Sequence, residues 1–119
     1  MARTAVVLRA ISLALLLACI AQRPLLAQES MGLRITALTS AERDSLAASA
    51  RASGDLRMIY ACVPAGLVVF ATQGGTVSRQ ALRDQVASTL AAIIAPQRIE
   101  PEEITLHAAE AACEIARGQ

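Results

Sequence analysis

The stretch of sequence that decides the fold is residues 56–71, which read LRMIYACVPAGLVVFA. Residues 56–63 alternate between two faces as a strand does, whereas residues 67–71 are apolar without interruption. The Pro-Ala-Gly triplet between them is typical of a turn, because proline fixes φ and glycine can adopt a positive φ. The pattern predicts a β-hairpin. Because the second run is apolar on both faces, we expect a central strand that is covered on both sides.

Before the hairpin, the sequence predicts one strand and one helix. Residues 33–38 alternate and indicate the strand. Thr39 and Glu42 then have the spacing of a capping box, which predicts a helix over residues 41–53 that ends at Gly54 in a left-handed cap. The side chains expected on one face of the strand are Leu33, Ile35 and Ala37.

After the hairpin, Ser78 is expected to cap a second helix, which Pro96 ends near residue 94 or 95. Its apolar stripe consists of Leu82, Val86, Leu90, Ile93 and Ile94. The chain after Pro96 has two interpretations. Pro101 can begin a third helix, but residues 104–107 could instead form a short strand. The apolar positions of that helix are Ile104, Ala108, Ala111 and Ile115.

Both interpretations give a small two-layer α+β domain with an antiparallel sheet of three to four strands and two or three helices. The order is either βαββα followed by a C-terminal helix, or the ferredoxin-like βαββαβ. A bond between Cys62 and Cys113 favours the helix. In the ferredoxin-like sheet the second and fourth strands lie at opposite edges, whereas bridged Cα atoms must lie within about 7 Å.

The N-terminus has the features of a signal peptide. Basic residues precede an apolar run at 10–19, which is too short to span a bilayer. We therefore expect residues 1–27 to be removed after Ala27, or alternatively after Ala21, and residues 28–119 to form a single domain. This predicts a periplasmic or secreted protein.

Residues 16–19 also resemble a lipobox, in which Cys19 would be acylated and anchor a lipoprotein. The signal peptide and this lipid are the only membrane contacts that the sequence predicts. Cleavage after residue 27 leaves Cys62 and Cys113, an even number that is typical of a disulfide in an oxidising compartment. Met58, Tyr60 and Cys62 should share one strand face, where Tyr60 either marks a binding surface or covers the core beneath the disulfide.

Composition argues against nucleic acid as a partner. The chain has no lysine, and loss of residues 1–27 removes three arginines and changes the formal net charge from +1 to −2. The remaining arginines are scattered, and the aromatic residues are only Tyr60 and Phe70. Binding to a phosphate backbone needs concentrated positive charge, and stacking on bases needs aromatic side chains.

No motif indicates catalysis or a cofactor. Serines are plentiful, but helix capping explains Ser40 and Ser78, and none lies in a G-x-S-x-G turn. We expect no catalytic residue, no resident metal and no cofactor. The sequence favours a non-enzymatic binding or interaction module of the bacterial envelope, with a protein or small-molecule partner.

The alternative is a metal-binding or redox protein that uses Cys62, Cys113 and His107. On a helix, a separation of six positions turns the side chains of His107 and Cys113 to different sides, which disfavours a shared site. A helical tail would also gather Glu103, His107, Glu110 and Glu114 on one face, which we interpret as a solvated acidic surface.

Overall fold

The computed structural model describes residues 29–74 and 77–119, and the predicted hairpin forms the middle of its sheet. Strands β2 (Leu56–Cys62) and β3 (Leu67–Thr72) pair antiparallel, and β1 (Ser30–Arg34) pairs antiparallel with the other side of β3. The strand order is therefore β1-β3-β2. At the turn, Gly66 has φ 69°, and a Cβ atom there would collide with the carbonyl oxygen of Ile35.

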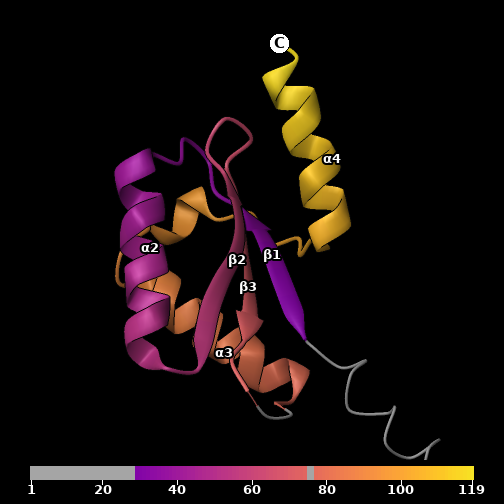
Figure 1. Cartoon of the computed structure of the whole chain (residues 1–119). Coiled ribbons are helices and arrows are strands. Elements are labelled where there is room, and N and C mark those ends of the chain that lie inside the picture. The colour runs from indigo at the N-terminus through magenta and orange to yellow at the C-terminus, as the bar shows by residue number, and fades with distance from the viewer. Residues whose placement is uncertain (1–28, 75–76) are drawn as a thin grey trace, which may run out of the picture.

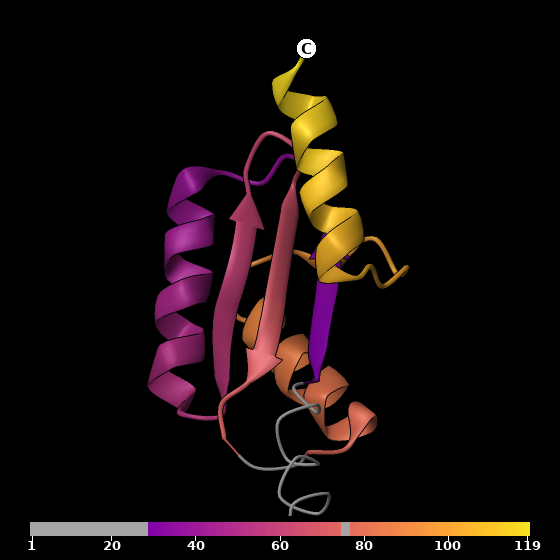
Figure 2. The same ribbon diagram turned by 45° about the vertical axis from the view of Figure 1, so that its right-hand side comes forward.

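Helices cover both faces of this sheet. Helices α2 (Ser40–Ser53) and α3 (Arg79–Ala91) pack on one face, and α4 (Leu106–Arg117) lies against the other (Figure 1). Figure 2 shows the three strands side by side with β3 in the middle and α4 in front. Helix α4 thus adds a third layer to the two that the sequence predicts. The predicted βαββα order followed by a C-terminal helix is confirmed.

Strand β3 belongs to both halves of the core, and all six of its residues are buried, as predicted. Val68 and Phe70 point into the larger cluster, which α2 and α3 cover. Leu67 and Val69 point into a smaller cluster beneath α4. The other buried members of the larger cluster are Met31, Leu33, Ile35, Leu38, Leu46, Ala50, Leu56, Leu82, Val86, Leu90 and Ile94.

The ends of the first two helices follow the sequence closely. The Thr39 side chain accepts a hydrogen bond from the Glu42 amide, and the Glu42 carboxylate accepts one from the Thr39 amide. Gly54 ends α2 with φ 76°, which confirms the predicted left-handed cap. Ser78 caps α3 by accepting a hydrogen bond from the Ala81 amide. Helix α3 ends at Ala91, a few residues before the predicted end.

The first strand differs from its prediction. It spans Ser30–Arg34 rather than residues 33–38, because the chain leaves the β3 ladder after Arg34. Beyond that point the Ile35 amide donates to the carbonyl of Gly66, and the Thr36 amide donates to Arg98. Leu33 and Ile35 are buried, but Ala37 is exposed with φ 56°, so the prediction that it shares one strand face with them is wrong.

Strand β2 contains a bulge that the sequence alternation hides. Its register against β3 shifts between Met58 and Tyr60. Met58 therefore packs against the larger cluster, whereas Ile59 and Tyr60 both pack against the smaller one. The prediction that Met58 shares a face with Tyr60 and Cys62 is wrong, because one extra residue reverses the alternation.

The tail forms a helix, but one that begins later than Pro101. Residues 98–104 run beside β1, where the Gly32 amide donates to the Ile104 carbonyl at 3.0 Å and the Ile104 amide donates back to Gly32 at 2.9 Å. These contacts are isolated bridges, so no fourth strand forms in the described chain. Thr105 then caps α4 by accepting a hydrogen bond from the Ala108 amide.

The face of α4 that contacts the sheet is not the predicted stripe. Ala109 and Cys113 are buried, whereas Ala108, Ala111 and Ile115 are exposed, Ile115 to 67%. The reason is the disulfide at Cys113, which fixes the rotation of α4 about its axis. In the ranges 29–74 and 77–119, no helix is long and apolar enough to cross a membrane. The predicted signal peptide, its cleavage after Ala27 or Ala21, and lipidation at Cys19 lie outside the described residues.

Candidate binding site

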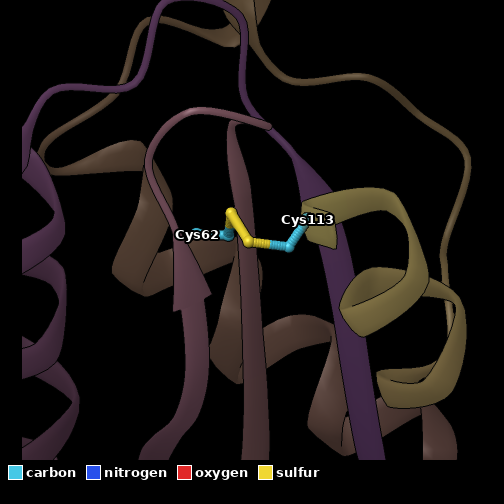
Figure 3. The surroundings of a disulfide bond; sticks show 2 residues. All are labelled: Cys62 and Cys113. Atoms are coloured by element: carbon cyan, nitrogen blue, oxygen red, sulfur yellow. A yellow bond between two sulfur atoms is a disulfide. The ribbon is translucent and has the colours of Figure 1, made fainter. Parts of the chain in front are cut away.

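The predicted disulfide is present and joins the last residue of β2 to the middle of α4 (Figure 3). The Cα atoms of Cys62 and Cys113 are 6.0 Å apart, and both residues are buried at 1% exposure. The bond lies in the smaller cluster, where half-buried Tyr60 packs against the same residues. Tyr60 thus covers the core beneath the disulfide, which is the second of the two roles that the sequence leaves open for it.

The structure does not bring the residues of the predicted alternative metal site together as ligands. The sulfur atoms of Cys62 and Cys113 are bonded to each other, so neither is a thiolate in this form. Cys113 is buried while His107 is exposed on α4, in agreement with their expected separation around the helix. Among the described residues, no group of three His, Cys, Asp or Glu side chains could hold a metal ion.

Glu103 does not join the predicted acidic face of α4, because it lies before the helix begins. Its carboxylate accepts hydrogen bonds from Arg83 Nε at 2.6 Å and from an Arg79 guanidinium nitrogen at 2.8 Å. Hydrogen bonds from Arg83 and Arg79 lower the pKa of Glu103. Arg79 also donates to the carbonyl of Ser30 at 2.6 Å, so this cluster fixes the tail against α3 and the start of β1. His107, Glu110 and Glu114 stay exposed.

A second arginine, Arg98, fixes the start of the segment 98–104, which runs beside β1. The Arg98 guanidinium contacts both carboxylate oxygens of Glu42, at 2.6 and 2.8 Å, and also donates to the carbonyls of Thr36 and Ala37. Hydrogen bonds from Arg98 and from the Thr39 amide lower the pKa of Glu42 to about 2. This pair orders the short helix η2 (Pro96–Arg98) beside β1.

One hollow on the larger cluster is an apolar groove between α3, β1 and residues 96–99. Its volume is about 260 Å³. The floor consists of buried side chains and the rim of small or half-exposed ones. The lining residues are Met31, Leu33, Ala87, Leu90, Ala91, Ile94, Pro96 and Ile99.

Two small side chains on α3 explain why this groove stays open. Ala87 and Ala91 lie one helical turn apart on α3 and are exposed, so they leave space that a larger side chain would fill. The opposite wall is Pro96 and Ile99, which Arg98 holds in place. None of the lining side chains carries a hydrogen-bonding group stronger than the weakly accepting thioether of Met31. The groove can therefore hold an apolar group but offers no acid, base or nucleophile.

Part of the floor of this groove consists of residues that the sequence predicts as apolar core positions, but no sequence pattern indicates the groove itself. Leu90 and Ile94 belong to the predicted apolar stripe, and Leu33 to the predicted strand face. The small side chains beside them were the available signal, but alanine is common throughout the chain and does not mark a rim. Comparisons with protein-family models, with curated proteins and with solved structures find no match for this chain.

Proposed function

We propose that the protein is a small, non-enzymatic binding module of the bacterial envelope whose ligand places an apolar group in the groove between α3 and β1. The observation that carries this proposal is the almost wholly apolar lining of the groove. Water there gains few hydrogen bonds, so replacing it with an apolar group is favourable. The buried disulfide supports an oxidising, periplasmic or secreted location.

The size of the groove indicates a small occupant. Sites for drug-sized molecules usually measure about 300–1,000 Å³, whereas an apolar cavity of about 150 Å³ is enough for benzene. A volume of about 260 Å³ therefore suits an aromatic ring or a short alkyl chain of a small molecule. Few atoms can contribute to such binding, so we expect a dissociation constant on the order of 1 mM for benzene itself.

The test is an NMR titration of the protein with benzene, with chemical shifts followed at the amides of α3 and β1. We expect shifts in Leu33, Leu90 and Ile94, and we expect Ala91→Leu to abolish them because its larger side chain fills the groove. Ala48→Leu is the matched control, since Ala48 is exposed on α2 and away from the groove. Equal binding by Ala91→Leu, or shifts confined to other regions, would disprove the proposal.

A further inference from the structure

A second pocket lies where α2 ends and β2 begins, away from the apolar groove. Its volume is about 270 Å³, and its lining residues are Ala47, Arg51, Arg57, Met58 and Gln73. Arg51 is in the last turn of α2 and Arg57 is the second residue of β2, so the Gly54 turn brings both arginines to the lining of one pocket. Gln73 follows β3 and is held there by a 2.9 Å hydrogen bond from its amide to the carbonyl of Asp55.

The two arginines of this pocket have no carboxylate partner in the described chain. Eight arginines lie in residues 29–74 and 77–119, and five of them form ion pairs at 2.6–3.7 Å. The exceptions are Arg51, Arg57 and Arg117. All ten acidic residues lie at or after Glu29 and within the described ranges, so a shortage of carboxylates does not explain the exceptions.

Two neighbouring cations without a counter-charge repel each other, and an anion between them removes that repulsion. The C-terminus of α2 carries only about half a negative charge, which two guanidinium groups exceed. Asp55 lies between the arginines in sequence, but it lines a different pocket with Ser53 and Asp84. The pocket therefore has a net positive charge inside a domain whose predicted mature form has a net charge of −2.

We propose that Arg51, Arg57 and Gln73 bind the phosphate group of a phosphomonoester. Each guanidinium presents a planar pair of N–H donors that matches two oxygens of a phosphate, and the Gln73 side-chain amide adds a further donor. Two such forks together with the Gln73 amide offer more donors than the roughly four lone-pair sites of a carboxylate, which favours the tetrahedral dianion. Ala47 and Met58 line the remaining wall with apolar surface that can contact the carbon skeleton of the ester.

The experiment measures phosphate binding to the purified protein by NMR titration or calorimetry. Inorganic phosphate, glycerol 3-phosphate and vesicles that contain phosphatidic acid are the three probes, and they distinguish free phosphate, a soluble ester and a lipid headgroup. We expect binding of at least one probe, with shifts at Arg51, Arg57 and Gln73. Arg51→Gln and Arg57→Gln should each weaken binding about ten-fold or more, because each removes charged hydrogen bonds to the anion.

Three controls separate a built site from general charge attraction. Arg117→Gln removes an equally unpaired arginine outside the pocket and should change affinity less than about two-fold. Arg57→Lys keeps the charge but loses the fork, and should also weaken binding. Thermal melts verify that the variants fold. An equal loss in Arg117→Gln, equal affinity for acetate, or no binding of any probe would overturn the proposal, and none of these outcomes bears on the apolar groove.

Discussion

At the scale of single residues, the structure rests on a few side chains whose contacts the sequence only partly predicts. Thr39, Glu42 and Gly54 follow from local spacing, because capping joins residues three or four positions apart. The partner of Glu42 is different. Arg98 lies 56 residues away, so only the folded chain brings the two together. The sequence identifies the cap and gives no sign of the ion pair that reinforces it.

Ala37 is the only non-glycine residue of the described chain with a positive φ, at 56°. An L-residue in this conformation costs about 1–2 kcal/mol, which glycine avoids. Part of the free energy that glycine recovers is lost, because glycine also makes the unfolded chain more flexible. We therefore expect Ala37→Gly to raise the free energy of unfolding by about 0.5–1 kcal/mol in urea denaturation. The control Ala48→Gly, at an exposed site inside α2, should lower it by about 1 kcal/mol. The same sign for both variants would contradict this prediction.

The Glu42–Arg98 pair predicts how stability depends on pH. The pKa of Glu42 is about 2 in the folded protein, below its ordinary value of 4.5. The unfolded chain then binds the proton more readily, so the pair's contribution to stability is full above about pH 4.5 and is lost as the pH falls towards 2. In Glu42→Gln, the free energy of unfolding should vary less over this window. NMR titration of the Glu42 carboxyl should show its pKa return towards the ordinary value in Arg98→Gln, and an unchanged low pKa there would exclude Arg98 as the cause.

At the scale of elements, helices and strands with strong local signals were predictable, and their edges were not. The hairpin, α2, α3 and the central place of β3 are confirmed, because turn residues, caps and apolar runs lie close together in sequence. The start of α4 at Leu106 instead depends on Gly32, whose main chain holds Ile104 in an extended conformation. The rim of the apolar groove likewise depends on contacts between separate elements, since Pro96 and Ile99 meet α3 only through the tertiary fold.

Helix α4 depends on the disulfide more than any other helix does. Only Ala109 and Cys113 of its residues are buried, so apolar contacts alone stabilise its position weakly. The bond closes a loop with a sequence separation of 51 residues. In the chain-entropy model this contributes about 4 kcal/mol, an upper figure because native strain reduces it. We expect reductant to lower the melting temperature and to speed hydrogen exchange in α4 before the strands.

The double variant Cys62→Ala/Cys113→Ala is the matched control for this experiment. It should resemble the reduced protein in melting temperature and should not respond to reductant, since no disulfide is left to reduce. A wild-type melting temperature that reductant leaves unchanged would show that α4 is held by packing alone.

At the scale of the whole molecule, β3 is the common wall of two separate clusters. The larger cluster beneath α2 and α3 contains most of the buried side chains, including Phe70. The smaller one beneath α4 is built around the disulfide. The two candidate ligand sites lie at opposite borders of the larger cluster: the apolar groove beside β1 and the arginine pocket beside β2. Each of the two outer strands therefore borders one of them.

The sequence by itself determined the α+β class, the hairpin and the caps of α2 and α3, because each depends on neighbouring residues. It also predicted the pairing of Cys62 with Cys113, since these are the two cysteines outside the predicted signal peptide. Tertiary structure alone decided the bulge in β2, the rotation and start of α4 and both pockets. These features arise where segments such as residues 30–34 and 98–104 meet across the sheet. Their geometry is set by packing and hydrogen bonding between distant residues, which no local pattern encodes.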